Sequence, residues 1–192
     1  MSTKVLGLAG SPRRRGNTER LLDAALEGAS EKGAETEKVI LDTLNIEPCN
    51  SCYYCSRTGQ CVVRDDMDAL YRKLQSADAV ILASPVYFRG VTAQSKVMID
   101  RCLLLWTLLY DLNRPWRQRS DRARGLFISA AGDKGPIEFR GPLLQARMFF
   151  RALGARWQPP VLLGGVNSRS DLLREHPAAL DDAKEAGARI VG

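Results

Sequence analysis

The sequence predicts an α/β fold, a doubly wound three-layer domain in which helices cover both faces of a sheet of five parallel strands. Short apolar runs alternate with stretches of helical periodicity along the chain, and this alternation is typical of parallel strands joined by helical crossovers. The run Ala79–Ala83 is apolar throughout, as expected of a strand buried on both faces. The 192 residues, 45% of them hydrophobic, suit a single domain, residues 1–192, with a full-sized core.

Local patterns define the elements of the first half of the chain. Val5–Ala9 is a short apolar run, and the apolar residues that follow Asn17 recur at helical spacing until Gly33. Asp65 and Asp66 offer an N-cap for a further helix. The predicted elements are, in order, a strand at 5–9, a helix at 17–30, a strand at 38–41, a helix that follows 65–66 and ends at 75, and a strand at 79–83.

The second half continues the alternation. The predicted elements are a helix at 92–109, a strand at 125–130, a helix at 142–153, a strand at 155–163 and a helix at 177–191. Pro159 and Pro160 place the latter half of the fifth strand at an edge or a bulge, because proline cannot donate to a sheet. Residues 103–109 are apolar on more than one helical face, which suggests burial against a partner subunit.

A loop rich in anion-binding groups separates the first strand from the first helix, at residues 10–18. It is neither a G-x-G-x-x-G loop nor a lysine-containing P-loop. The hydroxyls of Ser11 and Thr18, the Asn17 amide, the Arg13 guanidinium and backbone N–H groups at the helix start could all converge on one phosphate dianion. The alternative is a simple helix start with solvated arginines, but the position after the first strand favours phosphate binding.

Four cysteines lie within thirteen residues, in the pattern C-x2-C-x2-C-x5-C: Cys49, Cys52, Cys55 and Cys61. Such spacing is typical of a 4Fe–4S cluster, although four thiolates could also hold one structural zinc, and one C-x-x-C pair could act as a thiol–disulfide switch. Because this loop follows the second strand, we expect it at the same sheet edge as the phosphate loop. Cys102, within a run of leucines, is predicted to be a core residue.

Two of these segments resemble those of a known family. The loop Gly-Ser-Pro-Arg-x-x-Gly-Asn-Thr is similar to the FMN-phosphate loop of NADPH-dependent FMN reductases, and Ser-Pro-Val-Tyr-Phe at 84–88 resembles their flavin-ring loop. The cysteine motif between them narrows the resemblance to the iron–sulfur flavoproteins, a flavodoxin-like branch that carries FMN and a 4Fe–4S cluster. The resemblance covers roughly residues 4–135 and implies a flavodoxin-like sheet of strand order 2-1-3-4-5, with an embedded cluster-binding loop at 48–64 after the second strand.

The resemblance also implies roles for individual residues. The FMN-binding positions would be Ser11, Pro12, Arg13, Asn17 and Thr18 for the phosphate, Pro85, Val86, Tyr87 and Phe88 for the isoalloxazine ring, and Ala131 and Gly132 in a third loop. The metal ligands would be Cys49, Cys52, Cys55 and Cys61. No general acid or base is required, since the reaction centre would be the cofactor pair.

Composition narrows the set of partners. The net charge of +6 and the pI of about 9.2 suit anionic ligands, and no motif for reading nucleic acid is present. No apolar run reaches the roughly 18 residues of a membrane helix. No signal-peptide pattern follows Met1, so we expect a cytoplasmic protein.

The segment 114–124 is rich in arginine: Arg114, Arg117, Arg119, Arg122 and Arg124. This composition indicates a solvated loop or a subunit contact. The functional alternative is that the positive charge attracts NADPH or an acidic redox protein.

The sequence therefore predicts an FMN- and 4Fe–4S-dependent oxidoreductase that takes electrons from NAD(P)H or a reduced ferredoxin. The acceptor would be a small molecule or a protein, and the resemblance implies a homodimer or homotetramer. Two alternatives stay open: an electron carrier without its own substrate, and an NADPH-dependent FMN or quinone reductase with structural zinc in place of the cluster. A zinc-stapled nucleic-acid binder has only the basic charge in its favour.

Overall fold

A parallel sheet forms the centre of the computed structural model, which describes residues 2–114, 116 and 123–192. Within these ranges the strands are β1 (Lys4–Ala9), β2 (Glu35–Ile40), β3 (Ala79–Ala83), β4 (Arg124–Ala130), β5 (Arg156–Trp157) and β6 (Val161–Leu163). They follow the order β2-β1-β3-β4-β5, and β6 also pairs with β4. All of the pairings are parallel, so the predicted order 2-1-3-4-5 is confirmed.

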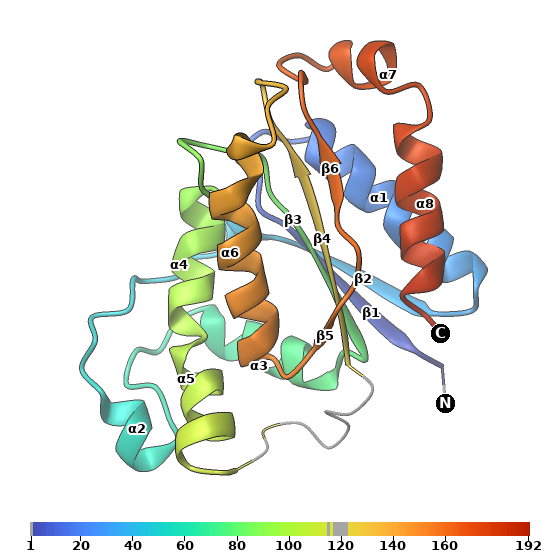
Figure 1. Cartoon of the computed structure of the whole chain (residues 1–192). Helices are drawn as coiled ribbons and strands as arrows, with labels where there is room; N and C mark the ends of the chain where they lie inside the picture. The colour runs from blue at the N-terminus through green and yellow to red at the C-terminus, as the bar shows by residue number, and fades with distance from the viewer. Residues whose placement is uncertain (1, 115, 117–122) are drawn as a thin grey trace.

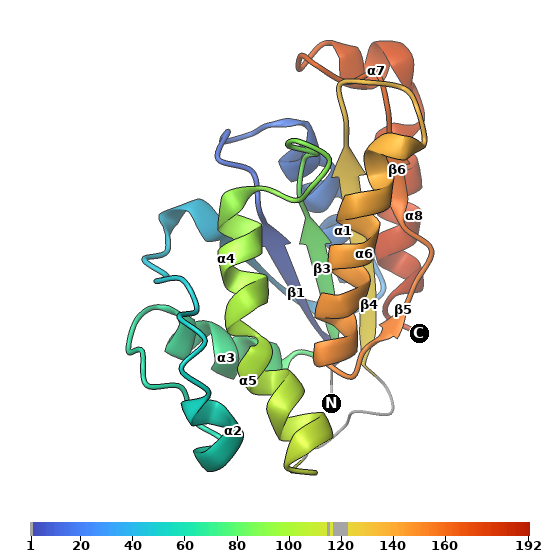
Figure 2. The same ribbon diagram turned by 60° about the vertical axis from the view of Figure 1, so that its left-hand side comes forward.

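Helices cover both faces of this sheet, as Figures 1 and 2 show. One face carries α1 (Asn17–Glu31) and α8 (Ala179–Arg189). The other carries α3 (Met67–Ser76), α4 (Ala93–Arg101), α5 (Leu103–Trp106), η2 (Thr107–Asp111) and α6 (Ile137–Ala152). Short elements lie in the connections: η1 (Leu41–Thr43), α2 (Tyr54–Thr58) and α7 (Asp171–Glu175). The expected three-layer arrangement is confirmed.

The two faces of the sheet have separate apolar cores. Alternate residues of β3 point to opposite sides, so Ile81 packs with α1 and α8 while Val80 and Leu82 pack with α3, α4 and α6. Cys102 is 1% exposed in the second core, which confirms its prediction as a core residue. Together these cores fix the carboxyl ends of β1, β3 and β4 beside one another.

The largest differences from the sequence prediction concern four segments. β2 begins three residues earlier than 38, because Glu35, Thr36 and Glu37 form an exposed edge that has no apolar signature. The predicted helix 92–109 is interrupted at Cys102 and ends in a π-helical turn. α6 begins five residues before Pro142, and β5 and β6 are two short strands separated by the segment that contains Pro159 and Pro160.

Candidate functional site

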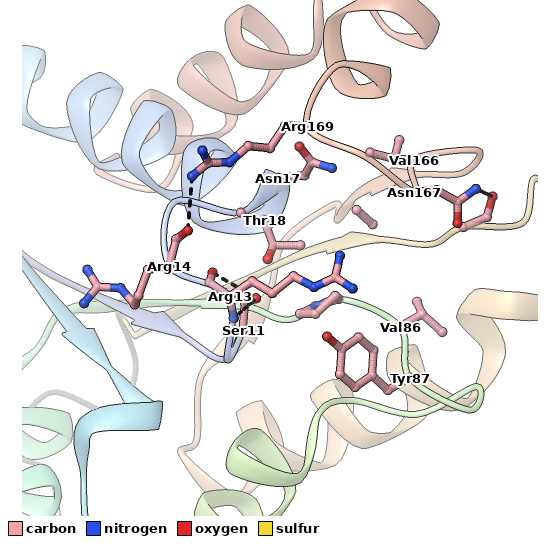
Figure 3. A pocket seen from close by; sticks show the side chains of 14 residues that line it. Ser11, Arg13, Arg14, Asn17, Thr18, Val86, Tyr87, Val166, Asn167 and Arg169 are labelled. Atoms are coloured by element: carbon pink, nitrogen blue, oxygen red, sulfur yellow. Dashed lines mark hydrogen bonds between the residues drawn. The ribbon is translucent and has the colours of Figure 1, made fainter.

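A cleft of about 460 Å³ lies beyond the carboxyl ends of β1, β3 and β4, where ligands bind in doubly wound folds. Its lining combines the loop after β1, the loop after β3, the end of β4 and a segment before α7 (Figure 3). The lining residues are Ser11, Arg13, Arg14, Gly16, Asn17, Thr18, Pro85, Val86, Tyr87, Ala130, Gly132, Val166, Asn167 and Arg169. The structure thus brings together eight of the eleven residues predicted for the flavin site.

The remaining three predicted residues lie outside this lining. Pro12 is half-buried beside the loop, and Ala131 is 2% exposed with its N–H bonded to the Leu163 carbonyl. Phe88 is fully exposed at the tip of its turn. The sequence placed Phe88 with its neighbours because the four residues are contiguous, but a tight turn carries it away from the cleft.

The N-terminus of α1 opens into the cleft without a side-chain cap. Gly16 occupies the N-cap position, so the first N–H groups of the helix have no side-chain partner there. Ser11 Oγ accepts a hydrogen bond from the Arg13 N–H at 3.1 Å, which curls the loop, and Thr18 is 2% exposed. Asn17 Oδ1 is buried and has no hydrogen-bond partner among the described residues. Donors and the positive helix end therefore face one space.

A segment distant in sequence holds the phosphate loop from the other side. Arg169 donates to the carbonyls of Arg15 at 2.9 Å and Arg14 at 3.1 Å, the latter drawn in Figure 3. Asn17 Nδ2 donates to the Ser168 carbonyl at 2.9 Å. This clamp is not predictable from the sequence, because no motif marks 166–169 and only the tertiary fold brings this segment to the loop.

A buried carboxylate in the first turn of α1 supports the phosphate loop. Glu19, 3% exposed, accepts hydrogen bonds from the Arg14 guanidinium, the Arg15 N–H and the Lys38 ammonium. Burial alone would raise the pKa of Glu19, but these hydrogen bonds outweigh it and hold the pKa below its usual value. Arg15 has a φ of 54°, a left-handed conformation that costs energy for a residue with a side chain. Glu19 compensates for this strain.

We expect Glu19→Gln to destabilise the protein at neutral pH and to remove part of its acid sensitivity. A lowered carboxyl pKa contributes stability above the unfolded value of 4.5, and this contribution is lost as the pH falls through the folded pKa. The difference in unfolding free energy between wild type and variant, measured with urea, should therefore shrink between pH 7 and pH 3. Glu185→Gln, at an exposed position on α8, is the matched control. A difference independent of pH would contradict this account.

The loop after β3 is fixed by α6. A tight turn pairs Tyr87 with Gly90, and Phe88 and Arg89 adopt left-handed φ values of 47° and 55°. Arg89 forms an ion pair with Glu138 at 3.1 Å. The Val91 N–H donates to Gln145 Oε1 at 2.9 Å. This support leaves the Tyr87 side chain facing the cleft, across from the Arg13 side chain (Figure 3).

Gly141 of α6 permits the close approach of this turn, and Gly141→Ala is expected to displace it. A Cβ at this position would lie 2.0 Å from the Arg89 carbonyl oxygen, a contact that requires the helix or the turn to move. We expect a loss of about 1–3 kcal/mol in unfolding free energy and weaker flavin binding. Thermal unfolding and flavin titration measure both. Gly135→Ala, where the nearest atom lies at 3.6 Å, should change neither. Unchanged behaviour of Gly141→Ala would show that the turn tolerates displacement.

The four cysteines of the motif line a second, smaller cavity together with Arg101, Leu103 and Leu104. Cys52 is exposed, and Cys49, Cys55 and Cys61 are half-buried. Among the described residues no three His, Cys, Asp or Glu side chains lie close enough to hold one metal ion. A single tetrahedral zinc needs its sulfurs within about 4 Å of one another, given Zn–S bonds of about 2.3 Å. An iron–sulfur cluster attaches each thiolate to a different iron, so its ligands stand farther apart.

The cysteine loop does not lie at the predicted sheet edge. After β2 the chain runs past α4 towards α2, at the end of the molecule opposite the loop that follows β1 (Figure 2). Thr92, at the start of α4, donates to the Gly10 carbonyl at 2.5 Å, whereas Arg101, at the end of α4, contacts Cys61. The nine residues of α4 span roughly 13 Å. The expectation of a shared edge is wrong because the eight residues between β2 and Cys49 carry the loop away from it.

Two further expectations have partial outcomes. The apolar stretch 103–109 packs against α2 on one side and α6 on another, so elements of the same chain cover much of it. Arg114 and Arg124 are described, and Arg124 donates to the Arg189 carbonyl at 3.1 Å. Arg117, Arg119 and Arg122 lie outside the described residues. In the described part of the chain, no helix combines the length and apolar character needed to cross a membrane.

Comparisons with known proteins show which family the chain resembles. The model of the family "NADPH-dependent FMN reductase" matches residues 3–161. An iron–sulfur flavoprotein of Archaeoglobus fulgidus is 51% identical over 100 residues, which cover 52% of this chain and 46% of the relative. One from Methanocaldococcus jannaschii is 46% identical over 98 residues, covering 51% of each. The matched segments thus span about half the length of these relatives.

The fold itself recurs in solved structures. An NAD(P)H:quinone oxidoreductase from Methanothermobacter marburgensis superimposes with a TM-score of 0.71 at 21% identity, covering 99% of this chain and 98% of that one. A flavodoxin from the domain Archaea gives a TM-score of 0.58 at 16% identity, covering 98% and 96%. The family match covers most of the chain and decides the assignment: this chain, which is similar to iron–sulfur flavoproteins over about half its length, belongs to the NADPH-dependent FMN reductase family.

Proposed function

We propose that this protein is an FMN- and 4Fe–4S-dependent oxidoreductase that passes electrons from NAD(P)H or a reduced ferredoxin to a small-molecule or protein acceptor. The observation that carries the proposal is the uncapped N-terminus of α1, open to a cleft that is also lined by the loop after β3. Membership of the family supports FMN as the occupant. The names of the relatives support a cluster at the cysteines.

The cleft residues fit FMN. The N–H groups of α1, the hydroxyls of Ser11 and Thr18 and the Arg13 guanidinium would hold the phosphate dianion. Tyr87 and Val86 offer apolar surface at the position of the ring. Bound there, FMN would accept two electrons and release them one at a time.

The cysteine cavity fits a cluster better than it fits zinc. The four cysteine side chains line one space without converging on one point, and Leu103 and Leu104 add apolar surface beside them. A 4Fe–4S cluster held by Cys49, Cys52, Cys55 and Cys61, in the embedded loop 48–64, would supply one-electron transfer. The thiolates would hold it near the surface, since Cys52 is exposed, where another redox centre can approach.

The positions of the two sites bear on the electron path. The flavin cleft and the cysteine cavity share no lining residue and lie at opposite ends of α4. We therefore favour a homodimer or homotetramer in which the cysteine loop of one subunit lies near the cleft of another. A groove of about 480 Å³ that contains Cys49, Trp106 and Met148 offers apolar surface for this contact.

The test is anaerobic purification with analysis of iron, acid-labile sulfide, zinc and FMN per chain. We expect about four irons and four sulfides, with one FMN. Stoichiometric zinc with FMN would support a zinc-containing FMN or quinone reductase instead. A product without flavin would overturn the assignment of the cleft.

An electron carrier without its own substrate is the second candidate, and the make-up of the cleft is compatible with it. Among the residues that line the cleft there is no Asp, Glu, His, Lys or Cys to act as a general acid or base. Steady-state oxidation of NAD(P)H with quinones, free flavin and oxygen distinguishes the two. A carrier would show turnover only when a protein partner is added, whereas a reductase would turn over with at least one small acceptor.

A further inference from the structure

Arg101 is the largest polar side chain in the interior, and it lies beside the cysteine cavity. It ends α4 and is 2% exposed, and it lines the cavity together with all four cysteines of the motif. Burial of a guanidinium is costly and is tolerated only where its donors find acceptors. The disposition of these donors therefore indicates what the residue does.

The guanidinium joins the two ends of the cysteine loop. Nη1 donates to the Glu47 carbonyl at 2.8 Å, before the first cysteine, and to Asp65 Oδ2 at 2.6 Å, after the last. Nη2 donates to the Val63 carbonyl at 3.4 Å and to Asp65 Oδ1 at 3.3 Å. Asp65 in turn accepts from the N–H groups of Glu47 and Met67. One side chain thus closes the loop at its base.

The surroundings of two nitrogen atoms of Arg101 are not explained by its support of the loop. Nη2 lies 3.6 Å from Cys61 Sγ, within the distance of an N–H···S hydrogen bond. Nε is buried and has no hydrogen-bond partner among the described residues. A purely structural ion pair with Asp65 would not leave a donor of a cation unpaired in the interior, because the lost hydration is costly. Arg101 lines the cavity, so sulfur-bound metal there would offer acceptors to the guanidinium, first of all to Nη2 beside Cys61.

We propose that Arg101 is a positioning residue of the cysteine centre, which braces the loop and donates N–H···S hydrogen bonds to the sulfurs of the bound cluster. This inference rests on the proposed function of the cysteines. Donors and positive charge beside the sulfurs stabilise the more negative, reduced state of a cluster, so Arg101 makes the centre easier to reduce and slower to lose.

The experiment compares wild type, Arg101→Lys and the neutral pair Arg101→Gln with Asp65→Asn. Lysine keeps the positive charge but lacks the planar set of N–H donors of the guanidinium. The double variant removes both charges, so that Asp65 is not left buried as an unpaired carboxylate. Each protein is reconstituted anaerobically with iron and sulfide. The readouts are the reduction potential of the cluster, the rate of cluster loss to a chelator, the FMN content and the melting temperature of the cluster-free protein. Lys96→Met, on the exposed side of α4, is the matched control.

We expect both variants to show a lower reduction potential and cluster loss at least about tenfold faster, with FMN content unchanged. The Lys96 variant should match wild type. A potential and a loss rate equal to wild type would overturn the inference, as would a lower melting temperature alone, since that result marks a structural role. Failure of wild type to bind a cluster at all would instead overturn the proposed function of the cysteines.

Discussion

Replacing Cys55 by Ser is expected to abolish the visible absorbance and the iron of the cluster while leaving FMN bound. Serine is nearly isosteric, but its hydroxyl does not replace a thiolate as an iron ligand in this set. FMN is retained because the cysteine cavity and the flavin cleft have no lining residue in common. The measurement is an anaerobic visible spectrum together with iron, sulfide and FMN analysis of the purified variant.

Cys102→Ala is the matched control for this experiment. Cys102 is the fifth cysteine of the chain, buried in the apolar core and absent from the cavity that the other four line. Its replacement should leave both chromophores in place, at a modest cost in stability for the lost volume. Parallel loss of FMN and iron in the Cys55 variant would show that the two sites depend on each other, contrary to their separation in the fold.

Replacing Thr18 by Val is expected to weaken FMN binding by about 10- to 100-fold. The Thr18 hydroxyl is buried in the first turn of α1 and lines the cleft, and no described residue is shown to bond it. A hydrogen bond to a charged group contributes about 1.5–3 kcal/mol, and valine keeps the shape of the side chain without the donor. Titration of apoprotein with FMN, followed by quenching of flavin fluorescence, measures the change.

Riboflavin makes this prediction specific to the phosphate. It lacks the dianion, so wild type and Thr18→Val should bind it with similar affinity. Thr36→Val, on the exposed edge strand β2, removes a hydroxyl far from the cleft and should bind FMN as wild type does. An equal loss of affinity for FMN and riboflavin would place the effect on the loop structure and not on recognition of the phosphate.

The strand order followed from the sequence because each central strand carries its own signal. Ala79–Ala83 is apolar in every position, and such a segment has few places in an α/β protein other than the middle of a sheet. The edge strand gave a weaker signal, since charged residues at 35–38 face solvent and hide its start. Pro142 predicts a helix start, but the helix accommodates this proline at its sixth residue.

The phosphate loop was predictable since it is local: its residues are contiguous and precede a helix. The clamp by Arg169, the support by Glu19 and the closing of the cysteine loop by Arg101 were not, because each depends on contacts across many residues of sequence. Arg101 lies in a helix, where a charged residue is ordinarily expected to face solvent. Its burial is a property of the packing, and the sequence alone carries no mark of it.

The contact between Arg169 and the phosphate loop has a consequence for how the chain can be shortened or can diverge. Arg169 lies beyond residue 161, where the family match ends, yet it fixes the carbonyls of Arg14 and Arg15. A fragment that retained every matched residue would lack the hydrogen bonds by which Arg169 connects the C-terminal part of the chain to the phosphate loop. Substitutions near the C-terminus could therefore change the affinity for a nucleotide even where the residues that contact the nucleotide are unchanged.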